Sequence, residues 1–153
     1  MKRELSCYMS HHIRGPEGDK ATAETRMANK AKAKKVARTL RQNFPIEVYC
    51  PGDNDEWAEI GYSEGIITVD QILDIDCKII DARDCMIMYH QYDKMGGGMV
   101  RELDHCIKTG KPYMIIDTNI IMYSTVVKIE EFLKGVADGK KNQEDDLGHR
   151  DKS

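Results

Sequence analysis

Two acidic residues of this 153-residue chain, Asp76 and Glu102, stand where a carboxylate could do chemistry. The segment 69–83 has helical periodicity, and Asp76 lies three or four residues from each of its apolar positions Ile72, Leu73, Ile79 and Ile80. It therefore projects from an apolar stripe, where a carboxylate is costly unless it is paired or lines a cavity. A hydrogen-bonded core aspartate is the alternative, but we favour a site residue, because tuned acids and bases occur in such settings.

Glu102 follows a glycine-rich stretch, "GGGMVREL", residues 96–103. Glycines let the backbone approach a ligand closely, and a helix that begins after them offers its first N–H groups to an anion. A helix N-terminus also favours an ionised carboxylate by about 0.3–1 kcal/mol, which would keep Glu102 available as a nucleophile. Composition alone does not decide the matter, since acids are common in first turns and triple glycine also occurs in flexible loops.

The segment "YMSHHIRG", residues 8–15, carries two histidines and an Arg-Gly corner directly after an apolar run. Adjacent residues on an extended segment point in opposite directions, so His11 and His12 are poorly placed to ligate one metal ion. The chain has no H-x-x-x-H, C-x-x-C or H-E-x-x-H pattern. Arg14 beside Gly15 instead offers a planar fork of donors and exposed backbone N–H groups, so we predict a phosphate-binding corner and no metal site.

Short apolar runs alternate with longer helical patterns and supply the frame for these residues. Strands are predicted at 5–9, 46–50, 84–90 and 112–117, and helices at 20–43, 69–83, 98–110 and 124–135. This alternation predicts a single α/β domain over 1–137, a flavodoxin- or Rossmann-like three-layer sandwich with a four- or five-stranded parallel sheet. Ligands of such folds bind at loops beyond the carboxyl ends of strands. The tail 138–153 has one leucine as its only large apolar residue, so we expect it to be disordered.

Composition limits the classes of partner. The net charge is −3, with 41% hydrophobic and 32% charged residues, which gives no overall attraction to nucleic acid or to an anionic membrane. No apolar stretch approaches the roughly 20 residues of a membrane span, and we expect no signal peptide. Five scattered cysteines favour reduced thiols and a cytoplasmic protein. We expect no cofactor.

Taken together, these residues resemble the nucleoside 2-deoxyribosyltransferase superfamily, and within it the 2'-deoxynucleoside 5'-phosphate N-hydrolases. The first loop of those hydrolases commonly ends in "S-I-R-G", and Tyr8 through Gly15 keep that register. A second likeness is an aspartate eight residues before the aspartate that opens the next strand, here Asp76 and Asp84. The third is a glycine-rich loop leading to a catalytic glutamate, here Glu102, followed by "TGKPYMIID".

The resemblance implies that Glu102 attacks the anomeric carbon of a nucleoside 5'-monophosphate and forms a glycosyl-enzyme intermediate that water resolves. Asp76 would assist proton transfer or orient the nucleophile, and Tyr8 would lie beside the carboxylate and the sugar. The phosphate-binding set carried over from the family is His12, Ile13, Arg14, Gly15, Gly96, Gly97, Gly98 and Ser124. A homodimer is implied, with Ser124 of a second subunit completing the site. The sequence departs from the family at His12 and Gly96, where the family commonly has serine.

The segment 50–62 is predicted to lie over the site as a lid, where Trp57 could stack on a base. Three other functions stay open at this point. A deoxyribosyltransferase would pass the sugar to another base, a nucleotide-sensing module would need neither Asp76 nor Glu102, and a flavodoxin-like signalling protein would share only the sheet. The sequence identifies neither the base nor the sugar.

Overall fold

The computed structural model describes residues 5–117 and 122–150, and its centre is a sheet of four parallel strands. The strands are β1 (Leu5–His11), β2 (Ile46–Tyr49), β3 (Cys85–Tyr89) and β4 (Tyr113–Ile116). Their order is β2-β1-β3-β4, so the chain leaves β1 to one side for β2 and crosses to the other side for β3. The predicted α/β class and the parallel sheet are confirmed, at the lower of the two predicted strand counts.

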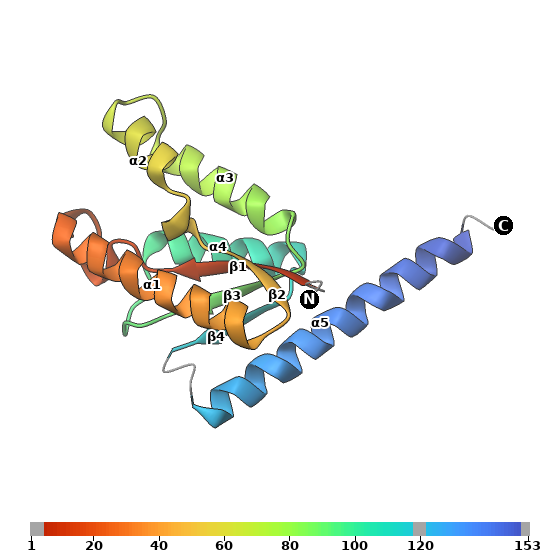
Figure 1. Ribbon diagram of the computed structural model, residues 1–153. Coiled ribbons are helices and arrows are strands. Elements are labelled where there is room, and N and C mark those ends of the chain that lie inside the picture. The colour runs from red at the N-terminus through yellow and green to blue at the C-terminus, as the bar shows by residue number, and fades with distance from the viewer. Residues whose placement is uncertain (1–4, 118–121, 151–153) are drawn as a thin grey trace.

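Helices cover both faces of the sheet and give the three layers seen in Figure 1. The α-helices are α1 (Ala23–Asn43), α2 (Glu56–Ser63), α3 (Val69–Asp81), α4 (Gly97–Thr109) and α5 (Tyr123–Arg150), and the 3-10 helices are η1 (Gly15–Lys20) and η2 (Pro51–Asp53). The helices α1 and α5 lie on one face, while α3 and α4 lie on the other. Within the described part of the chain, every helix is too short or too polar to cross a membrane.

Alternation along β1 divides its side chains between two cores. Cys7 and Met9 point into the core shared with α1 and α5. Tyr8 points the other way, into the core shared with α3 and α4, where Met86 and Met88 of β3 also lie. All five side chains are fully buried. The even-numbered positions of β1 therefore face the helices that carry Asp76 and Glu102.

Local signals fix the ends of the helices that flank the site. Thr68 and Gln71 form a capping box that starts α3, with the Gln71 N–H donating to the Thr68 hydroxyl at 3.2 Å. At its other end, α4 stops at Gly110, which adopts the left-handed conformation with φ 71°. The N-cap of α4 is Gly96, which has no side chain to cap the first N–H groups.

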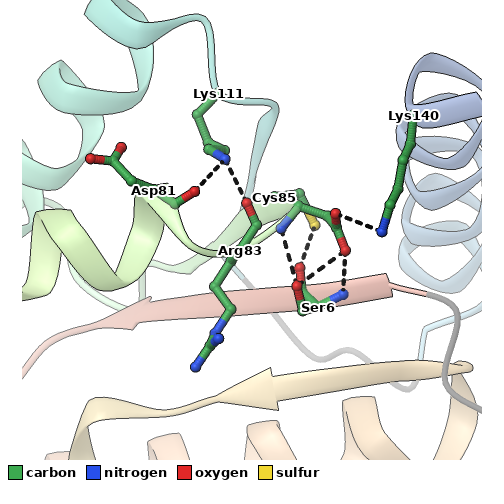
Figure 2. A network of polar contacts seen from close by, with 7 residues as sticks. Ser6, Asp81, Arg83, Cys85, Lys111 and Lys140 are labelled. Atoms are coloured by element: carbon green, nitrogen blue, oxygen red, sulfur yellow. Dashed lines mark hydrogen bonds and ion pairs between the residues drawn. The ribbon is translucent and has the colours of Figure 1, made fainter. Parts of the chain in front are cut away.

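The tail 138–153 was expected to be disordered, but helix α5 continues through most of it and ends at Arg150. The first half of α5 is anchored by Ile129, Leu133 and Val136 in the core. Beyond them, the Lys140 ammonium lies 3.0 Å from a carboxylate oxygen of Asp84. Figure 2 shows Lys140 pointing from α5 toward Ser6 at the start of β1. The shortage of apolar residues in the tail predicted disorder. However, extending a helix that is already docked avoids the cost of nucleating a new one.

Candidate active site

Glu102 lies in α4 with its side chain turned inward against β1, and only 6% of it is exposed. The Tyr8 hydroxyl donates a hydrogen bond to Oε1 at 2.7 Å, and the Ser10 hydroxyl donates to Oε2. Both oxygens of the carboxylate are therefore held by hydroxyl groups from successive inward positions of one strand. Burial raises the pKa of Glu102 to about 7; the charge of Asp76 adds to this, and the two hydroxyl donors oppose it.

Asp76 lies beside this pair, as the periodicity of α3 predicted. Burial raises its pKa to about 6, and the Tyr8 hydroxyl partly opposes that rise. Burial, together with the same two carboxylates, raises the pKa of Tyr8 well above its ordinary value, so its hydroxyl stays protonated. By contrast, Asp74 is largely exposed and pairs with Arg101 of α4. The structure thus brings Tyr8, Asp76 and Glu102 together and leaves Asp74 outside.

The Tyr8 ring also packs against a stack of side chains on the β2 side of the sheet. The ring of Tyr49 on β2 stacks on it with centroids 5.7 Å apart and planes inclined by 21°. The Arg83 guanidinium then lies 5.4 Å from the Tyr49 ring centroid. Figure 2 shows the Arg83 side chain extending across β1 toward β2. The position of the Tyr8 hydroxyl is therefore set by packing as well as by Glu102.

The adjacent histidines have separate partners, as their opposite directions predicted. The Gly52 N–H donates to Nε2 of His11 at 3.0 Å, so Nδ1 carries the proton and donates to the His12 carbonyl at 3.0 Å. His11 is thus a neutral link between β1 and η2. His12 turns elsewhere, and its Nε2 lies 2.8 Å from Nδ1 of His90, which follows β3. Across the described residues, no group of three or more His, Cys, Asp or Glu side chains is placed to hold a metal ion.

The loops that follow β1 and β3 are joined through a buried asparagine of α1. The Asn29 amide donates to the Ile13 carbonyl at 3.0 Å, and its oxygen accepts from Tyr92 at 2.6 Å and Gln91 at 2.8 Å. Gly15 is required where it stands, because its φ is +70° and a Cβ there would lie 3.0 Å from the Tyr92 ring. The two loops that could hold a ligand are therefore fixed to one another.

Arg14 does not point into this junction. Its guanidinium pairs with Asp19, whose side chain is 94% exposed, and lies 5.9 Å from the ring centroid of Tyr62 on α2. An exposed pair of this kind contributes little to stability, about 0–1 kcal/mol, so a phosphate could replace Asp19 at small cost. The phosphate role of Arg14 remains a prediction.

The remaining predicted residues are spread around the carboxyl edge of the sheet. Gly96 faces His12, because a Cβ placed there would lie 3.9 Å from Nδ1, and a Cβ placed on Gly98 would lie 3.3 Å from the Leu73 side chain of α3. Gly97 lines a groove of about 1000 Å³ between α3 and α4. Among the described residues that line this groove, neither Tyr8 nor Glu102 is found, so the groove is distinct from the buried carboxylates.

Trp57 and Ser124, two further residues that the sequence predicted to be at the site, lie on helices other than those that carry the two carboxylates. Trp57 is on α2, a helix beyond the carboxyl ends of the strands, and is 42% exposed. Ser124 is exposed in the first turn of α5. Its predicted role depends on a second subunit, which a single chain does not test.

Four residues of the site had escaped the sequence analysis: Ser10, Asn29, His90 and Tyr92. Ser10 could have been found, because it is two positions after Tyr8 and a strand alternates with period two. The other three depend on contacts between loops and α1, for which the sequence carries no local signal. Comparisons with protein-family models, with curated proteins and with solved structures find no match for this chain. The family resemblance therefore remains a prediction from the sequence.

Proposed function

We propose that this protein hydrolyses the N-glycosidic bond of a nucleoside 5'-monophosphate, with Glu102 as the nucleophile. The observation that carries the proposal is the cluster of buried Glu102 and Tyr8 with half-buried Asp76, in which Tyr8 donates to Glu102 at 2.7 Å and burial raises the pKa of both carboxyl groups. Retaining glycoside hydrolysis uses a pair of carboxyl groups, of which one is an ionised nucleophile and the other a general acid with a raised pKa.

The chemistry follows from the two positions. An ionised Glu102 oxygen forms a bond to the anomeric carbon as the bond to the base breaks, and a protonated Asp76 supplies the proton that the departing base needs. The ionised Asp76 then accepts a proton from water, whose oxygen displaces Glu102 and releases sugar 5-phosphate. Tyr8 and Ser10 donate to Glu102 and lower its pKa, but burial still leaves that pKa at about 7, above the value of about 6 for Asp76. The reactive form, with Glu102 ionised and Asp76 protonated, is therefore the minor protonation state of the pair.

Features at the carboxyl ends of β1 and β3 support a phosphorylated substrate. The helix α4 starts at a glycine that caps none of its N–H groups, and His12 faces that glycine. A helix N-terminus of this kind favours an anion. Arg14 stands in the same loop as His12, and its partner Asp19 is exposed.

A deoxyribosyltransferase is the second candidate, since it would form the same glycosyl-enzyme intermediate and resolve it with a base in place of water. The observation that favours it is the pairing of Arg14 with Asp19, which withholds one predicted phosphate contact. An acceptor base added to the assay separates the two reactions.

The test is release of free base from a panel of nucleoside 5'-monophosphates and the matching nucleosides, followed by chromatography. We expect release from at least one monophosphate and loss of that activity in Glu102→Gln. The matched control is Asp104→Asn, because Asp104 is an exposed acid two residues further along α4. Turnover by Glu102→Gln within about tenfold of wild type would refute the nucleophile, since such groups contribute far more. Absence of release from the whole panel, with and without acceptor bases, would refute glycosidic chemistry and leave the sensing module.

A further inference from the structure

The pair formed by His12 and His90 has an unusual environment for two histidines. His12 is only 3% exposed, its ring lies 5.1 Å from that of His90, and the edge of Tyr92 closes another side at 4.9 Å. Nε2 of His12 is engaged with His90, but its Nδ1 is buried and has no hydrogen-bond partner among the described residues. Leaving a buried polar atom without a hydrogen bond costs about 1–3 kcal/mol, so we expect a ligand to bind beside Nδ1 of His12.

The direction of this free nitrogen indicates what the ligand is. Nδ1 of His12 faces Gly96, the N-cap of α4, with only 3.9 Å to a Cβ built on that glycine. The first N–H groups of a helix have no partner within the helix, and no described side chain caps these. A buried imidazole nitrogen and an uncapped helix N-terminus thus converge on one place. Both are suited to an oxyanion with several acceptor oxygens, such as a phosphate monoester.

We propose that His12 and His90 form a proton-sharing pair that takes up one proton when an oxyanion binds between His12 and the N-terminus of α4. The proposal rests on the proposed function only in taking the natural oxyanion to be the 5'-phosphate of the substrate. It adds a regulation to that site, because the affinity for a phosphorylated ligand then rises as the pH falls.

The number of N–H protons on the two histidines explains why anion binding and proton uptake are coupled. A neutral pair carries two N–H protons for three places: Nδ1 of His12, the bridge between the rings, and Nε2 of His90. An anion fixes one proton on Nδ1 of His12, so Nε2 of His12 must accept the bridging proton from Nδ1 of His90. This leaves Nε2 of His90 unprotonated, and the negative charge of the ligand favours a third proton there. The bound pair is then a cation hydrogen-bonded to an anion.

The surroundings explain why His12 is neutral in the free protein. Burial lowers the pKa of His12 to about 4, and the neighbouring His90 and His11 lower it further. From β1, His11 is buried and has its own lowered pKa, and from the loop after β3, Tyr92 presents a ring edge. Arg14, from the loop that carries His12, is turned to Asp19. Glu102 on α4 and Asp76 on α3 have pKa values raised to about 7 and about 6, so a control must account for both.

The direction of the pH dependence follows. An anion raises the pKa of the pair, so protons are taken up on binding between the pKa of the free pair and that of the bound pair. In that interval one added proton makes the affinity change by up to about tenfold per pH unit, increasing toward acid. Inorganic sulfate is the suitable probe, because it stays a dianion where a phosphate monoester gains a proton at about pH 6.

The experiment is calorimetric titration of the intact protein with sulfate from about pH 6 to pH 8, in two buffers of different ionisation enthalpy. We expect tighter binding at the lower pH, with uptake approaching one proton. His90→Gln should bind more weakly and lose most of the pH dependence, because glutamine keeps hydrogen-bonding groups but does not titrate. Glu102 and Asp76 are present in both proteins, so the difference between the two proteins isolates the histidine pair. His105→Gln, at a surface histidine paired with Asp81, is the matched control and should behave as wild type.

Absence of sulfate binding, binding that is independent of pH, or a His90→Gln protein with the wild-type pH dependence would each overturn the proposal. Nitrogen-15 spectra of the imidazoles give a second measurement, since the added ion should protonate both nitrogens of His90. If sulfate binds as described while the nucleotide panel yields no free base, the anion site stands and the glycosidase fails. If base is released but anion binding does not depend on pH, the glycosidase stands and the proton-sharing pair is refuted.

Discussion

Replacing Tyr8 with phenylalanine removes one atom from the centre of the site. The Tyr8 hydroxyl donates to Oε1 of Glu102 at 2.7 Å, and its ring is fully buried against Tyr49. Phenylalanine keeps the ring and the stack, so the fold should persist. The lost interaction is one of the two hydrogen bonds that favour the ionised form of Glu102.

The size of the effect can be worked out from that contact. A hydrogen bond to a charged group contributes about 1.5–3 kcal/mol. One pKa unit corresponds to about 1.4 kcal/mol, so the pKa of Glu102 should rise by about one to two units from its value of about 7. At pH 7 the ionised fraction would fall from about half to about a tenth or less.

Two measurements follow the shift. The acidic limb of the pH profile for base release should move upward by about one to two units, while the rate at high pH changes less. The infrared carboxyl band of Glu102, assigned by its loss in Glu102→Gln, should titrate with the same shift and does not depend on activity. Tyr49→Phe is the matched control, because it removes a hydroxyl from the stacked ring without touching Glu102.

An unchanged titration of Glu102 in Tyr8→Phe would refute the electrostatic account of the site. A shift of equal size in Tyr49→Phe would also refute it, because the effect would then belong to the packing of the rings. Only a shift confined to the Tyr8 variant supports the hydrogen bond as its cause.

Three further predictions concern the same region. Asp76→Asn should lose about 10²-fold or more of base release, whereas Asp74→Asn, at an exposed position, should stay near wild type in steady-state assays. Gly15→Ala should lower the urea midpoint more than Gly18→Ala. Both have positive φ, which costs about 1–2 kcal/mol, but only Gly15 also meets a ring. Glu102→Gln should raise the free energy of unfolding by about 3 kcal/mol at pH 8 and little at pH 4.5. The raised pKa of Glu102 disfavours folding only above the unfolded-state value, and the penalty is complete above about pH 7. Equal effects at the two pH values would contradict this.

The sheet and one half of the site could be predicted because their signals are local. Each strand was a short apolar run, and Asp76 was assigned to the inward face of α3 by counting residues. The opposite directions of His11 and His12 followed from an extended backbone. These inferences need only the periods of helix and strand, which tertiary contacts did not override here.

The rest depends on contacts between segments far apart in the chain. His90 is 78 residues from His12, and Asn29 joins loops that belong to different strands. The direction of Arg14 is set by Asp19, which competes for it with any ligand. The helix in the expected tail has the same kind of cause, since the first half of α5 is docked and Lys140 reaches Asp84. The composition of a segment does not reveal which distant residues will contact it in the folded chain.

Two carboxylates held by β1 show what distinguishes a structural acid from the proposed nucleophile. At the amino end, burial would raise the pKa of Asp84, but the Ser6 N–H, the Lys140 ammonium and the Ser6 hydroxyl outweigh it and hold the pKa below its ordinary value. At the other end, the donors that reach Glu102 from the described residues are neutral hydroxyl groups, and its charged neighbour is a second carboxyl group. A cation would stabilise Glu102 and make it inert. The arrangement found here costs stability at neutral pH and leaves the negative charge available to a centre that develops positive charge, as an anomeric carbon does.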